Sequence, residues 1–160
     1  MSALVDALSP VALALEGLGV ASHVGGSVAS SFHGALRATF DVDLVADLAE
    51  PHVAPLVAAL AEQYYVDDGT MRDAIRERSS FNLIHLATMF KVDVFLPRRE
   101  YDLVALARAR RVRLGEGAGA REIPLATPED SLLSKLDWYR RGGEVSERQW
   151  GDILGILRVL

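Results

Sequence analysis

HVGGSVASSFHGALRATFDVDLVADL, residues 23–48, places two glycines and a serine directly after an apolar strand, and a second apolar strand then carries two aspartates. Residues 20–24 and 40–47 have the apolar and β-branched character of strands, and residues 27–33 suit a short helix between them. A charge within an apolar strand is costly unless something compensates it. The function of this sequence therefore depends on what compensates the aspartates.

Asp41 and Asp43 share one face of the predicted strand because side chains alternate along a strand, while Val42 and Leu44 face the core. Two carboxylates about 7 Å apart repel each other unless they are hydrated, protonated or bridged by cations. Mg²⁺ prefers carboxylate and phosphate oxygens, so the pair suits one metal ion or a closely spaced two-metal site. An exposed edge strand that carries aspartates without a function is the alternative.

A second predicted strand, residues 90–97, has Lys91, Asp93 and Phe95 on one face. Asp93 is the only acid in this apolar run, where an uncompensated charge is costly. If this strand lies beside residues 40–47, Asp93 completes a cluster of three carboxylates. The alternative is a simple salt bridge between Asp93 and Lys91 or an arginine.

Gly25, Gly26 and Ser27 form the turn between the first strand and the short helix. Glycines allow the backbone to approach a phosphate closely, and a helix start presents free N–H groups to it. Ser27 can cap the helix or donate its hydroxyl group to a phosphate oxygen. A tight strand-to-helix turn with no ligand is the alternative.

The rest of the 160 residues predicts an α/β fold with a single domain over residues 1–160, a core over 18–126 and C-terminal helices over 127–160. Pro10 is expected to break or restart the first helix. The other predicted strands are 64–66, 80–88, 110–114 and 121–126, and the predicted helices are 3–17, 50–64, 69–79, 100–110, 127–141 and 146–160. Thr127 and Ser146 are expected to cap the last two helices, with Asp130 three residues after Thr127 as in a capping box.

Composition excludes several classes of protein. There is no cysteine, so disulfides and thiolate metal sites are excluded. No apolar run could span a bilayer, and the N-terminus lacks the positive charge of a signal peptide, so no membrane association and a cytoplasmic location are expected.

The net charge of −5 disfavours strong nonspecific RNA binding, although the arginine-rich region 98–113 is a candidate surface for tRNA or another acidic acceptor. A solvated surface is the alternative for that region.

The combined pattern of Gly25-Gly26-Ser27, thirteen intervening residues, Asp41-Val42-Asp43-Leu44 and a later Asp93 resembles the signature of the DNA polymerase β-like nucleotidyltransferase superfamily. Over most of residues 20–157 the chain also looks like small bacterial nucleotidyltransferase-like proteins related to abortive-infection type toxins. The resemblance implies a small mixed β-sheet flanked by helices, with a C-terminal helical hairpin.

The resemblance also implies a reaction, the transfer of an NMP from an NTP to a hydroxyl group of RNA, tRNA or protein. Asp41, Asp43 and Asp93 would be catalytic and would bind two Mg²⁺ ions, for which Mn²⁺ could substitute, with Asp93 also a candidate general base. Gly25, Gly26 and Ser27 would hold the phosphates. A cognate antitoxin is an implied partner, and the oligomeric state is left open.

Three basic residues are further candidates for nucleotide binding: Arg37, Lys91 and Lys135. Lys91 and Lys135 are the only lysines of the chain. The alternatives are a surface arginine and an ordinary solvated lysine. Trp138 and Trp150 are expected to pack between the last two helices, with base stacking as the alternative.

Two other functions are compatible with the sequence. One is a catalytically silent member of the same fold that binds a nucleotide or a partner. The other is a small-molecule adenylyltransferase of the aminoglycoside type. Only two helices follow Ile123, so a small-molecule pocket would require a dimer or an open groove.

Overall fold

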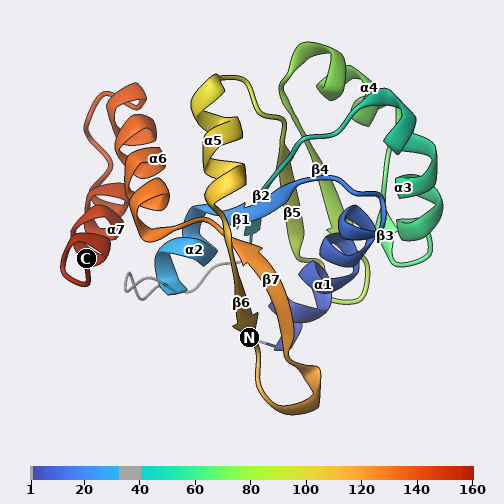
Figure 1. The fold of residues 1–160 in the computed structure, drawn as a ribbon, viewed down its shortest axis with the longest axis horizontal. Coiled ribbons are helices and arrows are strands. Elements are labelled where there is room, and N and C mark those ends of the chain that lie inside the picture. The colour runs from blue at the N-terminus through green and yellow to red at the C-terminus, as the bar shows by residue number, and fades with distance from the viewer. Residues whose placement is uncertain (1, 33–40) are drawn as a thin grey trace.

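A mixed β-sheet forms the centre of the computed structural model, which describes residues 2–32 and 41–160 (Figure 1). Within these residues the sheet has seven strands in the order β3-β4-β5-β2-β1-β7-β6. The strands are β1 (Ser22–Gly25), β2 (Asp41–Ala46), β3 (Tyr64–Tyr65), β4 (Ser80–His85), β5 (Lys91–Phe95), β6 (Arg110–Leu114) and β7 (Arg121–Leu125). The expected α/β fold with a mixed sheet is confirmed.

Helices and short 3₁₀ turns connect these strands. In Figure 1, α3 and α4 lie at the right of the sheet, α6 and α7 lie at the left, and α5 lies between them. No helix in the described part of the chain is both long enough and apolar enough to cross a bilayer. The elements are α1 (Ser2–Gly17), α2 (Gly26–Phe32), η1 (Glu50–His52), α3 (Val53–Leu60), α4 (Asp68–Glu77), α5 (Glu100–Arg108), η2 (Gly117–Gly119), α6 (Pro128–Arg141) and α7 (Glu147–Leu157).

The centre of the sheet is β2, which pairs with β1 in the antiparallel direction and with β5 in the parallel direction. Val42, Leu44 and Ala46 are buried on one face of β2. This alternation is the one that the sequence predicts, since one face of the strand packs in the core and the other carries the aspartates. The predicted neighbourhood of the two aspartate-bearing strands is confirmed.

The helix α1 continues through Pro10, so the predicted break is wrong. Proline removes one hydrogen bond from a helix, but burial on both sides of Pro10 holds this helix together. Leu8 and Val11 are both buried in the core that the sheet forms. The Tyr64 hydroxyl of β3 also donates a hydrogen bond of 2.5 Å to the carbonyl oxygen of Ala7. The core thus includes α1, which precedes residue 18.

The predicted helix over residues 50–64 is shorter in the structure. A 3₁₀ turn, η1, contains Pro51, and α3 ends at Leu60. The helix does not extend to residue 64, because Tyr64 and Tyr65 pair with β4 and form the edge strand β3. Tertiary pairing therefore overrides the helical periodicity at this end.

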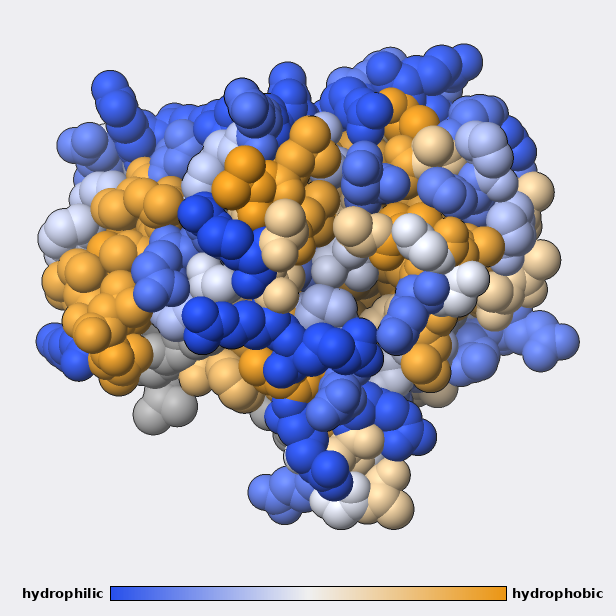
Figure 2. Space-filling view, viewed as in Figure 1, coloured by the Kyte–Doolittle hydropathy of each residue, from blue (hydrophilic) through white to orange (hydrophobic). Residues whose placement is uncertain are grey.

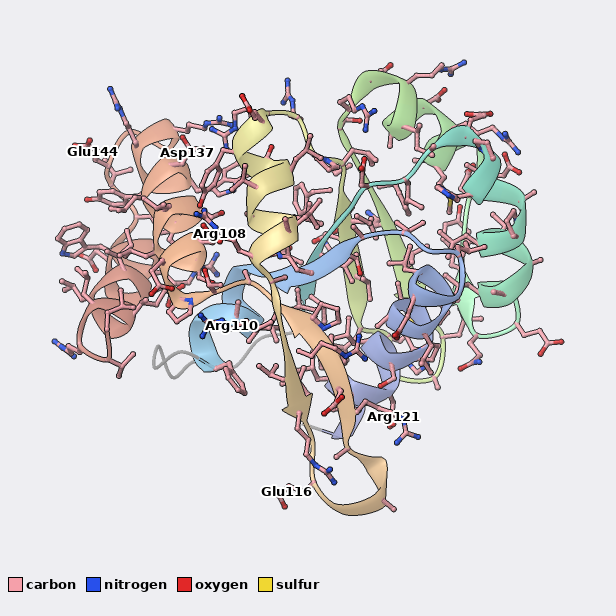
Figure 3. All side chains as sticks on the ribbon, viewed as in Figure 1. Arg108, Arg110, Glu116, Arg121, Asp137 and Glu144 are labelled. Atoms are coloured by element: carbon pink, nitrogen blue, oxygen red, sulfur yellow. The ribbon has the colours of Figure 1, made fainter. Side chains whose placement is uncertain are left out.

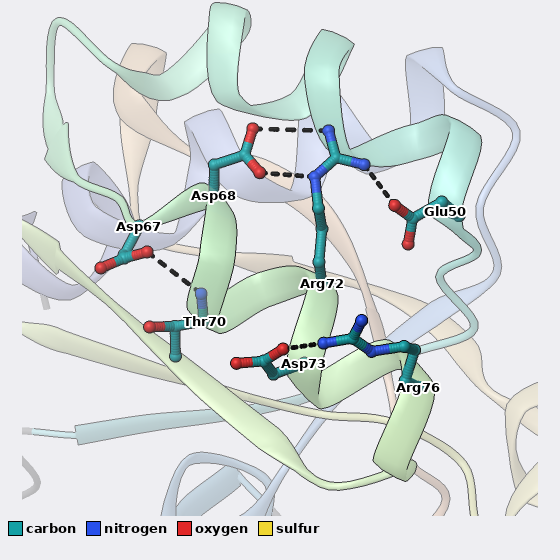
Figure 4. A network of polar contacts seen from close by, with 7 residues as sticks. All are labelled: Glu50, Asp67, Asp68, Thr70, Arg72, Asp73 and Arg76. Carbon is teal, nitrogen blue, oxygen red and sulfur yellow. Dashed lines mark hydrogen bonds and ion pairs between the residues drawn. The ribbon is translucent and has the colours of Figure 1, made fainter.

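Ion pairs at the surface join α4 to η1 (Figure 4). Asp67 accepts a hydrogen bond from the backbone N–H of Thr70 and caps α4, while Arg72 pairs with Asp68 and Glu50. Exposed pairs of this kind contribute about 0–1 kcal/mol each, so they support the position of α4 and do not determine it.

The C-terminal helices form the predicted hairpin. Thr127 and Ser146 cap α6 and α7 by accepting hydrogen bonds from the backbone N–H groups of Asp130 and Gln149, as the sequence predicts. Both helices also contact α2. Figure 2 shows apolar residues gathered at the left, over α6 and α7.

We expect Leu8→Ala in α1 to lower the free energy of unfolding by about 2–5 kcal/mol, because Leu8 is fully buried and its truncation leaves a cavity. Leu13→Ala is the matched control on the same helix, since Leu13 is 58% exposed, and it should change stability by less than about 0.5 kcal/mol. Urea unfolding followed by circular dichroism measures both. Equal effects would contradict the assignment of α1 to the core.

Candidate active site

The register of β2 and β5 places Asp43 directly opposite Asp93 and Asp41 directly opposite Lys91. Residues opposite each other on neighbouring strands lie about 5 Å apart at their Cα atoms. Because β2 and β5 are parallel and in this register, the three predicted aspartates and Lys91 share one face of the sheet. The structure therefore brings together the side chains that the sequence could assign only to separate strands.

Lys91 already forms an ion pair on this face. Its Nζ lies 3.4 Å from Oδ2 of Asp93, so the salt bridge that the sequence offered as an alternative is present. The same geometry leaves Asp93 opposite Asp43. The salt bridge therefore coexists with the placement of Asp43 and Asp93 on neighbouring strands.

The pKa values of both inner carboxyl groups are raised. Burial raises the pKa of Asp43 first, the negative charge of Asp93 raises it further, and Lys135 opposes the shift. Burial likewise raises the pKa of Asp93, and Lys91 opposes it. A raised carboxyl pKa means that the ionised form is less stable here than in water, and a bound cation would relieve that cost.

The glycine turn lies against the same carboxylate. Gly25 ends β1 opposite Asp43, and Gly26 begins α2 with a φ of +58°. A Cβ atom on Gly26 would lie 1.9 Å from Oδ2 of Asp43. Glycine is therefore required at residue 26 for both its backbone conformation and the space beside Asp43. Ser27 follows in the first turn of α2, and the placement of its side chain is outside what the structure describes.

A cavity of about 680 Å³ opens over this face of the sheet, with walls from α5, α6 and α7. Of the predicted site residues, it is lined by Gly25, Gly26, Asp43 and Lys135. Asp41, Asp93 and Lys91 lie on the same sheet face but not in the cavity lining. Arg37 lies outside the described residues. The cavity volume is in the range of small-ligand sites, about 300–1,000 Å³.

Lys135 is a fixed charge in the cavity wall. Its Nζ lies 2.9 Å from Oδ2 of Asp152 in α7, and its side chain is 13% exposed. The alternative of an ordinary solvated lysine is therefore wrong. Its positive charge opposes the rise in the pKa of Asp43.

The structure adds Asp130 to the cavity lining, a residue that the sequence indicated only as part of a helix cap. Arg108 Nη2 lies 2.6 Å from its carboxylate, and the Tyr101 hydroxyl donates to it at 2.9 Å. Burial and this hydrogen bond raise the pKa of Tyr101 to about 12. The contacts join α5 to α6, and Arg108 lies between these helices in Figure 3. The sequence signal was an acid just inside a helix start, which normally indicates only capping.

Two polar side chains of the lining, His23 and Ser131, are buried; the backbone of Val24 interacts with His23, and Oγ of Ser131 has no hydrogen-bond partner among the described residues. Burial lowers the pKa of His23, so its imidazole is neutral at pH 7. Buried polar atoms are normally satisfied in native proteins. The inner end of the cavity therefore has hydrogen-bonding capacity that a ligand could use.

The arginines of region 98–113 do not form one surface. Arg98 and Arg99 line the cavity, and Arg108 pairs with Asp130. Arg111 pairs with Glu16 and Glu122 at the β6–β7 hairpin. The predicted acidic-acceptor surface is thus divided between the cavity and the β6–β7 hairpin.

The donor chemistry of the aspartate face fits Mg²⁺, because all the candidate ligands are carboxylate oxygens. Among the residues that the structure describes, however, no three or more His, Cys, Asp or Glu side chains converge in a ligating arrangement. Asp93 is instead turned to Lys91. A metal ion here would require the carboxylate side chains to reorient.

Gly26→Ala should lower the free energy of unfolding by about 1–3 kcal/mol, because alanine is strained at positive φ and its methyl group would displace the Asp43 carboxylate. Gly25→Ala is the matched control. Gly25 has no positive φ, and the nearest atom to its added Cβ would be 3.8 Å away. Urea unfolding compares the two variants, and an equal loss of stability would contradict the assigned role of Gly26.

We expect Asp43→Asn to be more stable than the native chain at neutral pH and to lose that advantage in acid. In the unfolded chain Asp43 has its ordinary pKa of about 4, and the folded pKa is higher, so stability falls as pH rises between the two values. Asparagine does not ionise and removes this loss. Unfolding free energies from about pH 3 to pH 8, measured without divalent ions, test this. A difference between the proteins that does not change with pH would contradict it.

Three solved structures share this fold. An antigenic nucleotidyltransferase-like protein from Paracoccidioides brasiliensis is 22% identical, with a TM-score of 0.59, over 98% of this chain and 74% of its own. The antibiotic-resistance factor ANT(2'')-Ia is 13% identical, with a TM-score of 0.59, over 97% of this chain and 83% of its own. The lincosamide antibiotic adenylyltransferase LnuA, solved with lincomycin bound, is 15% identical, with a TM-score of 0.51, over 91% of each chain.

No protein-family model and no curated protein sequence matches the chain. At these identities the structural likeness is one of fold. The chain therefore has a fold of the nucleotidyltransferase type.

Proposed function

We propose that this protein transfers an NMP from an NTP to a hydroxyl group of an acceptor. The observation that carries the proposal is the placement of Asp43 between Asp93 on β5 and the Gly25–Gly26 turn on β1, at the edge of a ligand-sized cavity. An aspartate pair beside a glycine turn suits a nucleotide triphosphate with its cations. The nucleotidyltransferase-type fold of the neighbours supports the same reaction class.

In this proposal Asp41, Asp43 and Asp93 would hold two Mg²⁺ ions. When bound, these ions would neutralise the charge that develops on the attacking and leaving oxygens. The backbone at Gly25 and Gly26, with Ser27, would hold the β- and γ-phosphates. Lys135 is fixed by Asp152 in the cavity wall, from which its charge can act on the phosphates.

The reaction would be an in-line displacement at the α-phosphorus. The acceptor oxygen forms a bond to phosphorus, the bond to the bridging α–β oxygen breaks, and pyrophosphate leaves. The hydroxyl proton passes to a base, for which Asp93 is the candidate because it lies on the sheet face opposite Asp43. Positioning and charge stabilisation would supply most of the rate.

A small-molecule acceptor is the second candidate, beside RNA or protein. The cavity is formed within one chain and supplies the groove that a small acceptor would need. The chain also spans 83% and 91% of the ANT(2'')-Ia and LnuA chains, so its size is similar to theirs. These observations support the adenylyltransferase alternative more than the sequence alone did.

Transfer of label from each α-³²P-NTP, with Mg²⁺ or Mn²⁺, should be detectable into one class of acceptor: total bacterial RNA, protein or a panel of hydroxyl-bearing antibiotics. Asp43→Asn should reduce the rate by about 10²-fold or more, because charge stabilisation is lost. Asp47→Asn is the matched control, since Asp47 follows β2 and pairs with Arg78 at the surface. It should retain the rate within about twofold.

The outcomes separate the candidates. Label in RNA or protein supports the first candidate, and label in an antibiotic supports the second. NTP binding without transfer to any acceptor would favour the silent member of the fold. Absence of both binding and transfer would contradict the proposed function.

A further inference from the structure

One face of α6 runs along the cavity. Ser131, Lys135, Trp138 and Arg141 all line it, and their spacings of three and four residues place them on one side of the helix. Along the helix the stripe changes from a buried hydroxyl to a fixed cation, then to an indole ring and a guanidinium group. The cavity wall on α6 therefore offers a hydroxyl group and a cation at one end and an aromatic ring at the other.

The two tryptophans of the chain have different surroundings. The Trp150 ring packs against Tyr139, with centroids 5.3 Å apart and an interplanar angle of 33°. Trp138 is 50% exposed and lines the cavity. Trp150 of α7 thus packs against α6, as predicted, whereas Trp138 presents part of its ring to the cavity.

Arg141 lies beside Trp138 and forms an ion pair with Asp137. Its Cζ lies 5.8 Å from the centroid of the Trp138 ring, and its Nε lies 3.2 Å from Asp137. Asp137 in turn pairs with Arg99 of α5 at 3.3 Å. Figure 3 shows Asp137 at the upper part of α6, toward α5. The indole and its neighbouring cation are therefore held at the wall between these helices.

The stripe on α6 leads from the level of Asp43 toward Trp138. Lys135 lines the same cavity as Asp43, so this end of the stripe lies beside the carboxylate face. Trp138 lies three residues farther along α6, a rise of about 4.5 Å. If phosphates lie at Asp43 and Lys135, the sugar and the base extend along the helix toward Trp138.

We propose that Trp138 is the platform on which the base of the NTP stacks, with Arg141 supporting the ring. Every base has a π-face, so such a platform binds a nucleotide without selecting its base. This inference rests on the proposed function, because it takes the ligand of the cavity to be an NTP.

Fluorescence of a Trp150→Phe protein tests the inference, since Trp138 is then the only tryptophan. The probes are α,β-methylene analogues of the four NTPs with Mg²⁺, and inorganic triphosphate as a probe without a base. The nucleotides should quench Trp138 and triphosphate should not. Trp138→Leu should raise the dissociation constant of the nucleotides by about tenfold or more and leave that of triphosphate unchanged. Trp138→Phe keeps a ring and should bind nucleotides within about threefold of the native chain.

Equilibrium dialysis separates failure of the inference from failure of the proposed function. Nucleotides that bind the native chain and the Trp138→Leu variant equally would overturn the stacking role and leave the proposed function intact. An equal loss of nucleotide and triphosphate binding in the Trp138→Leu variant would also overturn it, because the role would then be structural. If neither probe binds the native chain, the proposed function fails and the inference fails with it.

Discussion

The parallel pairing of β2 with β5 is the constraint on which the rest of the site depends. These strands are separated in the chain by η1, α3, β3, α4 and β4, since a parallel pair requires a long crossover. Their register alone puts Asp43 opposite Asp93. A slip of one residue would turn one of these carboxylates to the core face, where Val42 and Val92 now pack. The buried apolar faces of both strands therefore fix the position of the carboxylates.

This arrangement makes the ionised forms of Asp43 and Asp93 less stable in the folded chain than in water. Burial and mutual repulsion raise the pKa of Asp43, and burial raises that of Asp93. The only lysines of the chain offset part of this cost from opposite sides, one beside Asp93 and one across the cavity. Perturbed carboxylates in a cavity are typical of functional sites, because binding and catalysis need groups that a purely structural role would avoid.

The walls of the cavity are held by polar contacts between α5 and α6. Asp130 is buried on α6 and is satisfied by Arg108, Tyr101 and Thr127. A buried carboxylate of this kind destabilises the protein when one of its partners is lost, so its contacts favour one arrangement of the two helices. A second contact, from Arg99 to Asp137, joins the same helices farther along. These contacts join the two helices that form part of the cavity wall.

Local patterns in the sequence determined much of this protein. Alternation along residues 41–46 and 91–95 identified the strands and the shared faces of their charges, and Thr127 and Ser146 identified the starts of the last two helices. These features could be predicted because they depend on the period of a strand or on the first turn of a helix.

Only the tertiary structure decided what depends on contacts between distant segments. Pro10 remains inside a helix because the core holds α1 on both sides of it, and the helix that begins near Glu50 ends at Leu60 because the next residues join the sheet edge. The pairing of Lys135 with Asp152, the role of Asp130 and the different environments of Trp138 and Trp150 likewise come from the packing of α6 against its neighbours. The sequence determined which residues carry charge and which face they share, and the fold decided which of those charges meet, because proximity between segments is set by packing and register.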